Sequence, residues 1–455
     1  MSASSSSVKK LAIRGAIWTI IGYGTSQVVR FVSNIVLTSL LVPELFGLMS
    51  LVYVFITGLH LFSDLGINAN VVQSKRGDDP AFLNTAWTVQ VLRGVGLWVC
   101  CLFIAFPASQ IYKTPELLWL IPIVGIATLL NGFNSTAIFS LNRHLSVRQL
   151  ALYELGGQVT SISVTLIWAA ISPSIWALIV GNFVSASFQL FWSHRLNSIA
   201  PNRFTWEPKA VKELISFGKW IFVSTVLTFL ATQADRLILG TLFTLQLLGI
   251  YHVAYALSDI PRGVLLAISG KVIYPAYSKF VDLPRDEFRA KILRNRGPIL
   301  IAAAFGLAAL VGFSDIVVKI LYRESYSVDA SWMVPLLSMG LWPIMLTQTI
   351  DPALIAIGKP SYNAFASFTS FLVYAIGIPF GFYSPLGEVG AVLAVALSNI
   401  PIWCATAYGL WREKLPVFRQ DALSTALFLA ILSVLAMIRN ALGLGLPFEG
   451  LFTLQ

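Results

Sequence analysis

Charged side chains within long apolar runs are the residues of this sequence most able to do chemistry. Four are arginines and four are aspartates: Arg30, Arg93, Arg236 and Arg262, with Asp64, Asp235, Asp259 and Asp351. A charge at membrane depth is costly, so it usually faces a protein interior or a water-filled cavity. The pattern therefore predicts a cavity in which the arginines bind an anionic substrate. The aspartates would pair with these arginines or bind a coupling ion.

Arg30 is the clearest of these candidates. At a rise of 1.5 Å per residue it lies about 24 Å along a helix from Arg14, too far for its side chain to extend to the interface. Its neighbours at helical spacing form a polar stripe on an otherwise apolar helix: Ser26, Gln27, Ser33 and Asn34. This stripe favours contact with substrate in a cavity. The alternative is a structural ion pair with Asp64, Asp259 or Asp351.

The charges of the second half of the chain also allow two interpretations. Asp235 and Arg236 are adjacent, so they either pair locally or lie near the outer interface. Asp259 and Arg262 flank Pro261, which interrupts the helix expected there. The interruption suits a hinge or an ion site. Alternatively, the two charges form an internal pair, because residues three apart share one helix face.

Arg93 and Asp351 stand close to the ends of apolar runs, which leaves their depth open. Arg93 either faces the interior or marks the cytoplasmic edge of its span. Asp351 precedes a proline near the inner end of its span and has the same ambiguity.

The sequence has no constellation typical of an enzyme. It contains no phosphate-binding P-loop, and its four histidines lack metal-ligand spacing. His60 lies within an apolar run, where a structural role is favoured. The three cysteines also lie in apolar runs and suggest neither a metal site nor a disulfide framework. We therefore expect no catalytic residues, no metal and no cofactor.

The composition identifies the class of protein. Of 455 residues, 56% are hydrophobic and 11% are charged, whereas a soluble protein has about 25% charged residues. The long unbroken apolar runs exclude a transmembrane β-barrel, whose strands alternate in polarity. Backbone groups in lipid must be satisfied within each segment, so we expect an all-α polytopic membrane protein.

The apolar runs predict where the membrane spans lie. We expect spans at residues 13–41, 44–66, 84–110, 116–140, 150–171, 174–194, 217–240, 249–272, 296–321, 330–353, 361–383, 387–410 and 421–439. The loops between them are short and rich in Pro, Gly and Asn.

The distribution of charge predicts the orientation. With the N-terminus inside, most of the 31 Lys and Arg residues fall on the cytoplasmic side, Arg296 among them, whereas few fall outside, as Arg439 does. This asymmetry predicts a cytoplasmic N-terminus. It also explains the net charge of +10 without a nucleic-acid partner.

A basic, proline-containing stretch after the sixth expected span predicts two lobes. The expected parts are an N-terminal six-helix lobe at 1–194, a cytoplasmic linker with an interfacial helix at 195–216, a C-terminal six-helix lobe at 217–410, and an extra helix and tail at 411–455. A shift of 202 residues supports this division, because it aligns Lys10 with Lys212, Trp18 with Trp220, Leu40 with Leu242, Gly47 with Gly249 and Tyr53 with Tyr255. Six spans per lobe make the repeat parallel, with a pseudo-twofold along the membrane normal and a site between the lobes.

Several segments carry a resemblance to a known family. NIVLTSLLVPELFGLMSLVYVFITGLHLFSDLGI, DPAFLNTAWTVQ, ADRLILGTLFTLQLLGIYHVAYALSDIP and GKVIYPAYSKF resemble bacterial polysaccharide transporters. These are oligosaccharide-lipid flippases of the multidrug/oligosaccharidyl-lipid/polysaccharide exporter superfamily, here of the colanic-acid-exporter type. The resemblance implies a V-shaped flippase fold of 12–14 transmembrane helices in the bacterial inner membrane.

The same resemblance implies a substrate and partners. The substrate would be an oligosaccharide repeat unit on undecaprenyl diphosphate, flipped from the inner to the outer leaflet by alternating access. Arg30 matches the position where family members carry cavity arginines, and arginine can grip a diphosphate bidentately. We expect a monomer that contacts membrane lipids, with polymerase and chain-length proteins of the export pathway as candidate partners.

Two other functions remain open at this stage. A cation-coupled multidrug exporter of the same superfamily would favour a cavity dominated by carboxylates, against which the basic Arg30 argues. A membrane scaffold of a polysaccharide assembly complex would tolerate loss of the Arg30 side chain.

Overall fold

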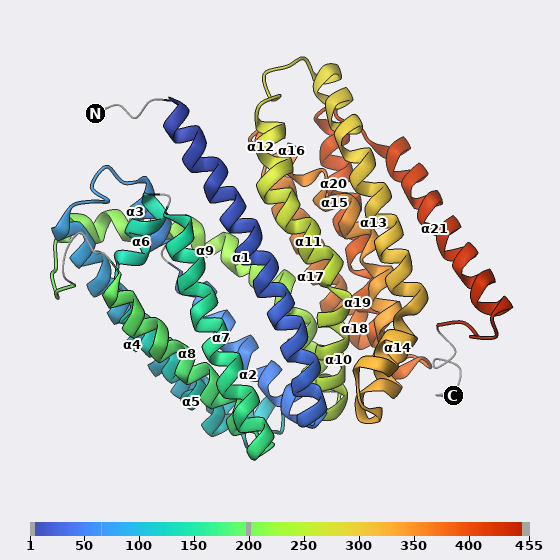
Figure 1. Cartoon of the computed structure of the whole chain (residues 1–455), viewed down its shortest axis with the longest axis horizontal. Coiled ribbons are helices and arrows are strands. Elements are labelled where there is room, and N and C mark those ends of the chain that lie inside the picture. The colour runs from blue at the N-terminus through green and yellow to red at the C-terminus, as the bar shows by residue number, and fades with distance from the viewer. Residues whose placement is uncertain (1–4, 65, 145, 197–201, 448–455) are drawn as a thin grey trace. The chain divides into compact units, whose positions relative to one another are not determined.

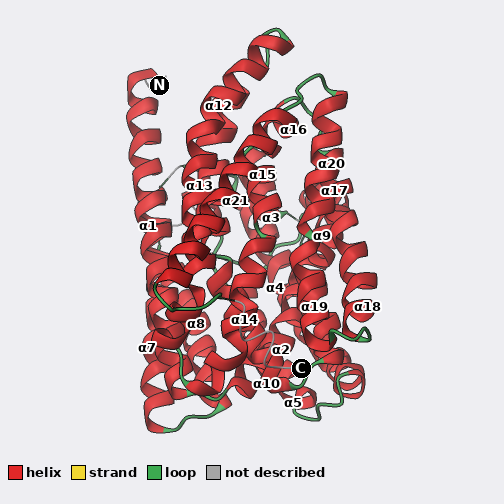
Figure 2. Cartoon of the chain, turned by 90° about the vertical axis from the view of Figure 1, so that its right-hand side faces the viewer, coloured by secondary structure: helices red, strands yellow, loops and turns green. Residues whose placement is uncertain are grey.

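The computed structural model describes residues 5–64, 66–144, 146–196 and 202–447, with the side chains of residues 5–21, 23 and 216–224 left aside. In these ranges the chain forms helices joined by loops, and no strand (Figure 2). Two compact units are present. The N-terminal unit comprises Met1–Leu41 and Leu48–Phe229, and the C-terminal unit comprises Val42–Gly47 and Leu230–Gln455.

The helices of the N-terminal unit pack mainly with neighbours in the chain, as Figure 1 shows for α4 with α5 and α7 with α8; α1 also packs on α7. Their bounds are α1 (Ser5–Leu40), α2 (Pro43–Phe62), α3 (Ile67–Gln73), α4 (Pro80–Ile111), α5 (Leu117–Gly132), α6 (Ala137–Arg143), α7 (Val147–Ile171), α8 (Ile175–Arg195) and α9 (Pro208–Leu242). The first turn of α2 and the end of α9 belong to the C-terminal unit.

The C-terminal unit consists of shorter helical pieces and two long helices, α13 and α21, which pack on each other. The helical elements of this unit are α10 (Leu245–Ser258), α11 (Ile260–Ile268), η1 (Ser269–Ile273), α12 (Tyr274–Ser278), α13 (Arg285–Leu321), α14 (Glu324–Gly340), α15 (Trp342–Gln348), α16 (Asp351–Ala356), α17 (Ser361–Leu372), η2 (Val373–Gly377), α18 (Ile378–Phe382), α19 (Gly387–Leu397), α20 (Asn399–Arg412) and α21 (Phe418–Ala441). The two η elements are single turns of π-helix.

The expectation of an all-α polytopic membrane protein is confirmed. Among the described residues, nine helical segments are long and apolar enough to span a membrane, or ten when the bent pair α5/α6 counts as one span. The helices α1 and α9 have 36 and 35 residues, and α10 to η1 occupy the span expected at 249–272. Each span expected from sequence thus coincides with a helix or a series of helices.

Several spans are broken, and the breaks have local causes. Between α2 and α3 the chain turns at Gly66, whose φ of 59° is left-handed and favours glycine. Helix α5 meets α6 at an angle of 62°. The break between α10 and α11 falls at Asp259, before Pro261, as the sequence predicts.

The segment between α8 and α9 is bound to α4. Three alternate backbone N–H groups of this segment donate to three side-chain oxygens of α4: Arg203 to Asn84 (3.1 Å), Thr205 to Thr88 (3.0 Å) and Glu207 to Thr85 (3.3 Å). We call residues 202–207 the strap. The expected interfacial helix is the beginning of α9, which starts at Pro208 and continues to Leu242.

Arg76, in the loop before α4, fastens the end of the strap. Its guanidinium pairs with Asp79 at 2.5 Å and with Glu207 at 2.7 Å. Asp79 also caps α4, because its side chain accepts a hydrogen bond from the Ala81 N–H. Hydrogen bonds from Arg76 hold the pKa of Asp79 and the pKa of Glu207 below their ordinary values.

Candidate functional site

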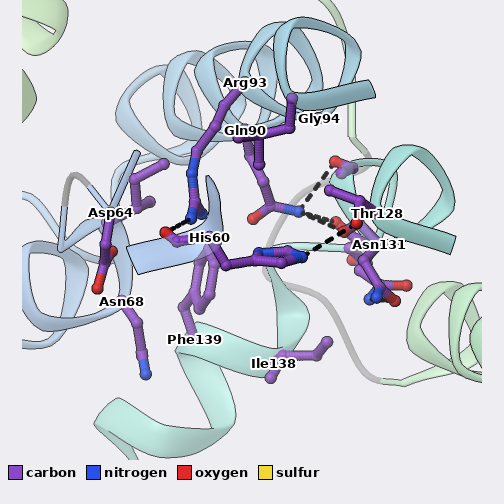
Figure 3. Close-up of a pocket in the computed structure, with 15 residues that line it drawn as sticks. His60, Asp64, Asn68, Gln90, Arg93, Gly94, Thr128, Asn131, Ile138 and Phe139 are labelled. Atoms are coloured by element: carbon purple, nitrogen blue, oxygen red, sulfur yellow. Dashed lines mark hydrogen bonds between the residues drawn. The ribbon is translucent and has the colours of Figure 1, made fainter. Parts of the chain in front are cut away.

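The N-terminal unit contains a polar pocket of about 240 Å³ where the breaks α2/α3 and α5/α6 meet α4. Figure 3 shows Gln90 and Arg93 approaching from α4, Ile138 and Phe139 of α6 on the opposite side, and His60 of α2 between them. Further polar side chains that line the pocket are Asp64, Asn68, Thr128, Asn131, Asn134 and Ser135.

One face of α4 satisfies the backbone at the α5/α6 break. A helix break frees carbonyl groups, which need donors wherever water is absent. Gln90 and Trp87, three residues apart on α4, supply them. Their bonds run from Gln90 Nε2 to the carbonyls of Asn131 (3.3 Å), Gly132 (3.0 Å) and Asn134 (3.0 Å), and from Trp87 Nε1 to that of Phe133 (3.3 Å).

Arg93, on the same face of α4, satisfies the end of α2. Its Nη2 donates to the His60 carbonyl at 2.8 Å, and its Nε donates to Ser63 Oγ at 2.9 Å. The His60 ring itself lies 3.1 Å from Thr128 Oγ1 of α5. Arg93 lies within α4 and lines the pocket.

Asp64 gives the pocket its negative charge. Its Oδ1 accepts a hydrogen bond from the Gly66 N–H at 2.9 Å, which stabilises the turn between α2 and α3. Asp64 and Arg93 line the same pocket. The pocket therefore contains one carboxylate and one guanidinium, whose charges offset each other.

The far side of the α5/α6 break is bound to α8 and to the strap. The Ser135 N–H donates to Ser193 Oγ of α8 at 3.0 Å. Asn202, the first residue of the strap, accepts from Thr136 Oγ1 at 3.0 Å and donates to Ser135 Oγ at 2.8 Å. The same break thus contacts the pocket on one side and the segment leading to α9 on the other.

Arg30 lies in α1 and its side chain is exposed. No described carboxylate of the N-terminal unit pairs with it; Asp64 bonds to Gly66 instead. Ser26, one turn earlier, donates to Gln158 Oε1 of α7 at 2.6 Å, which fixes this part of α1. Asp64, one of the three partners that the structural alternative allows for Arg30, forms no ion pair with it.

Arg262 and Asp259 form the ion pair that their spacing allows. Arg262 Nε lies 2.5 Å from Asp259 Oδ1, and Nη2 lies 3.0 Å from Oδ2. Both side chains are partly buried at the α10/α11 break. The bidentate geometry agrees with the structural alternative for these residues.

Asp235 and Arg236 have separate partners. Asp235 is 2% exposed and accepts a hydrogen bond from the Tyr251 hydroxyl at 2.6 Å. Arg236 donates to Gln233 Oε1 at 3.1 Å and lies over the Tyr255 ring, 5.1 Å from its centre. The sequence allows local pairing or a position near the outer interface for these two residues. Neither alternative includes this contact with the tyrosines of α10.

Two further buried arginines are not recognisable as such from sequence. Arg296 is 0% exposed and pairs with Asp421 at 2.5 Å, while Arg439 is 1% exposed and pairs with Asp315 at 2.8 Å. The charge distribution assigns Arg296 to the cytoplasmic side and Arg439 to the outer side, and it predicts no buried ion pair for either. The two pairs connect α13 with α21. Asp351, the remaining candidate, begins α16 in the same unit.

No metal site is present in the part of the chain that the structure describes, since no three His, Cys, Asp or Glu side chains come together there. The candidate site is thus the pocket at α4, together with the exposed Arg30.

Comparison with models of protein families identifies the family of this chain. The model of the family described as "Polysaccharide biosynthesis protein" matches residues 36–330. The chain belongs to this family. The resemblance seen in the sequence is therefore confirmed.

Named relatives of this family member are transport and biosynthesis proteins of bacterial polysaccharides. The teichuronic acid biosynthesis protein TuaB of Bacillus subtilis is 22% identical over 94% of this chain and 89% of its own length. The succinoglycan biosynthesis transport protein ExoT of Rhizobium meliloti is also 22% identical, over 66% of this chain. The lipopolysaccharide biosynthesis protein WzxC of Escherichia coli is 22% identical over 70% of this chain. The chain spans 61% of the length of ExoT and 65% of that of WzxC.

Solved structures show the same fold. The lipid II flippase MurJ in an inward closed conformation has a TM-score of 0.68 and 13% identity, over 94% of this chain and 99% of that one. An inward-facing multidrug resistance MATE family transporter of the MOP superfamily has a TM-score of 0.65 and 14% identity, over 85% and 94% of the two chains. ExoT is named as a transport protein and the two solved structures as a flippase and a transporter, none of them as an enzyme.

Proposed function

We propose that this protein moves a lipid-linked oligosaccharide, carried on undecaprenyl diphosphate, from the inner to the outer leaflet of the bacterial inner membrane. Its membership of the polysaccharide biosynthesis family carries the proposal. The likeness of its fold to a lipid II flippase supports it. The oligosaccharide would then enter exopolysaccharide, capsule or O-antigen synthesis.

Arg30 is the residue that we assign to the diphosphate. It lies far along an apolar helix from Arg14, where an uncompensated charge is costly. Its side chain is exposed, and no described carboxylate of its own unit pairs with it. A guanidinium in this condition is suited to bind an anionic oxygen pair bidentately. Arg93, Arg236 and Arg262 already hold structural partners, so they are secondary candidates.

The orientation and the two-lobed organisation are parts of the same proposal. The concentration of Lys and Arg on alternate loops supports a cytoplasmic N-terminus. The shift of 202 residues supports two six-helix lobes that bind substrate between them and alternate in access. Asp235 and Asp351 are the aspartates that we retain as candidates for ion coupling. The protein would act as a monomer in contact with membrane lipids and polymer-assembly proteins.

A multidrug exporter of the same superfamily is the competing function, because the fold also resembles a multidrug transporter. Such a protein binds organic cations best with available carboxylates. Here Asp259 pairs with Arg262, and buried Asp235 accepts a hydrogen bond from Tyr251. These contacts favour an anionic substrate.

The experiment measures polymer secretion in the native host after deletion of the gene, with rescue by wild type, Arg30→Ala or Arg30→Lys at matched membrane abundance. Arg203→Ala is the control, since Arg203 is an exposed arginine of the strap. We expect wild type and the control to restore secretion, Arg30→Ala to fail, and Arg30→Lys to restore part of it. Normal secretion by the deletion strain, with sensitivity to toxic cations instead, would favour the exporter.

A further inference from the structure

The pocket at α4 is not explained by a contact between Arg30 and a diphosphate. It is a partly open hollow lined by residues of α2, α3, α4, α5 and α6 and the loops between them, within one unit, and its volume is about 240 Å³. Sites for drug-sized ligands measure about 300–1,000 Å³. The hollow itself is therefore large enough for a single small ring and not for a whole oligosaccharide.

The charge of the pocket indicates a neutral ligand. Arg93 and Asp64 contribute one positive and one negative charge. A phosphate would be attracted by Arg93 but repelled by Asp64, and an organic cation would meet the opposite combination. A ligand without net charge avoids both penalties.

The hydrogen-bonding groups of the pocket indicate hydroxyl groups on that ligand. Arg93 uses Nε and Nη2 for the end of α2, and no described group accepts from its Nη1. Asp64 uses Oδ1 for Gly66, and no described group donates to its Oδ2. The Oδ1 of Asn134 is buried without a partner. Each hydroxyl group both donates and accepts, so several of them on one ring could satisfy such a mixture of donors and acceptors.

The apolar side of the pocket suits the carbon skeleton of a ring. Figure 3 shows Phe139 and Ile138 of α6 opposite the polar groups of α4. A sugar ring presents hydroxyl groups at its edge and C–H groups on its faces. Polar groups on one wall and apolar groups on the other match this distribution.

We propose that this pocket binds one uncharged sugar ring. This inference rests on the proposed function, in which the sugar belongs to the lipid-linked oligosaccharide. Arg93 and Asp64 bind hydroxyl groups of the ring, and Phe139 packs against its face. After a small rotation of its amide, Asn134 accepts a hydrogen bond from a further hydroxyl through Oδ1. The pocket thus recognises sugar, whereas Arg30 recognises the diphosphate.

Binding is measured with purified protein in lipid nanodiscs, which avoids detergents with sugar headgroups. The probes are glucose, galactose, mannose and N-acetylglucosamine, compared with glucuronate, glucosamine and inorganic phosphate. We expect at least one neutral sugar to raise the melting temperature, and charged probes to bind about tenfold more weakly or not at all. Binding of phosphate or glucuronate in preference to every neutral sugar would overturn the proposal. So would the absence of an effect from any neutral sugar at high millimolar concentration.

A leucine substitution assigns the binding to this pocket. Asn134→Leu removes the amide, and we expect it to raise the apparent Kd of the bound sugar about tenfold, as loss of one buried hydrogen bond does. Asn363→Leu is the matched control, because Asn363 Oδ1 is also buried without a partner but lies in α17, outside the pocket. An equal loss in both variants, or none in Asn134→Leu, would contradict the assignment.

Secretion separates this proposal from the function on which it rests. If the deletion strain secretes polymer normally, the transport function fails whatever the pocket binds. If deletion abolishes secretion and Asn134→Leu restores it fully, while no neutral sugar binds wild type, then the pocket proposal alone fails. We expect Asn134→Leu to restore secretion only partly, at normal membrane abundance.

Discussion

Gly47 of α2 and Gly249 of α10 lie back to back at the contact between the first turns of these helices. A Cβ added at Gly47 would overlap the carbonyl oxygen of Leu245, and a Cβ added at Gly249 would overlap that of Pro43. Positions 47 and 249 differ by 202, as do positions 43 and 245. The contact is therefore reciprocal, as a local twofold axis requires.

Bulk at this contact should impair transport. We predict that Gly249→Val, which forces the backbones of α2 and α10 apart, lowers polymer secretion at least about tenfold while the protein still reaches the membrane. Secretion and membrane abundance are measured together in the complemented deletion strain. Gly96→Val is the control, because a Cβ at Gly96 meets nothing within 4 Å. Equal secretion by both variants would mean that the close approach has no role in the cycle.

Gln90 should be important for stability. Gln90→Leu leaves the carbonyls of the α5/α6 break without their donor, and each buried unsatisfied group costs about 1–3 kcal/mol. We predict a clearly lower melting temperature in detergent than for Gln110→Leu, an exposed position at the end of the same helix. Equal melting temperatures for the two variants would show that other groups satisfy this break.

The strap should weaken in acid. Since Arg76 lowers the pKa of Glu207 and the pKa of Asp79 in the folded protein, both carboxylates stabilise it fully above their ordinary pKa values. That contribution is lost as the pH falls through the folded pKa values. We predict that Glu207→Gln melts below wild type at neutral pH and that the difference shrinks below about pH 4. A difference that is constant with pH would refute the charge-based account.

Glu116→Gln is the control for this measurement. Glu116 is an exposed glutamate before α5, and it forms no ion pair with any described residue. Its melting temperature should follow that of wild type at every pH. A change equal to that of Glu207→Gln would reflect total charge instead of the strap.

The pair Arg296–Asp421 should be the most sensitive of the buried contacts tested by substitution. Asp421→Asn leaves a fully buried guanidinium without its counter-charge, and loss of one partner of such a pair costs about 3–5 kcal/mol. We predict strongly reduced membrane abundance and a lower melting temperature. Asp282→Asn, at an exposed aspartate, should change neither quantity. Normal abundance of Asp421→Asn would show that water or another acceptor compensates Arg296.

The sequence predicts the helices well because each span is a long apolar run that lipid requires to be helical. It allows the pair Asp259–Arg262 as one of two alternatives, because a spacing of three residues places both on one helix face. It does not predict the partner of Arg296, because Asp421 lies 125 residues away. In the sequence, Arg296 and Arg439 look like charges at the ends of spans. A basic residue beside an apolar run gives the same signal whether it is solvated or buried in an ion pair.

The pocket lies beyond sequence reasoning for a related reason. Arg93 is recognisable as a candidate, but Gln90 and Asn134 are ordinary polar residues until the breaks at Gly66 and after Gly132 bring freed carbonyls against α4. Polar residues at spacing of three on an apolar helix, as in Gln90 and Arg93, are the signal that could have found this face.

Transport by the purified protein is the most direct test of the central claim. Proteoliposomes are prepared with an undecaprenyl-diphosphate-linked oligosaccharide from the host, and the fraction open to a membrane-impermeant sugar oxidant is measured. We predict that wild type makes nearly the whole pool accessible, whereas Arg30→Ala leaves only the outer-leaflet fraction accessible, as empty liposomes do. If wild type behaves like empty liposomes, even with an ion gradient or a membrane potential, then the protein does not move this class of lipid.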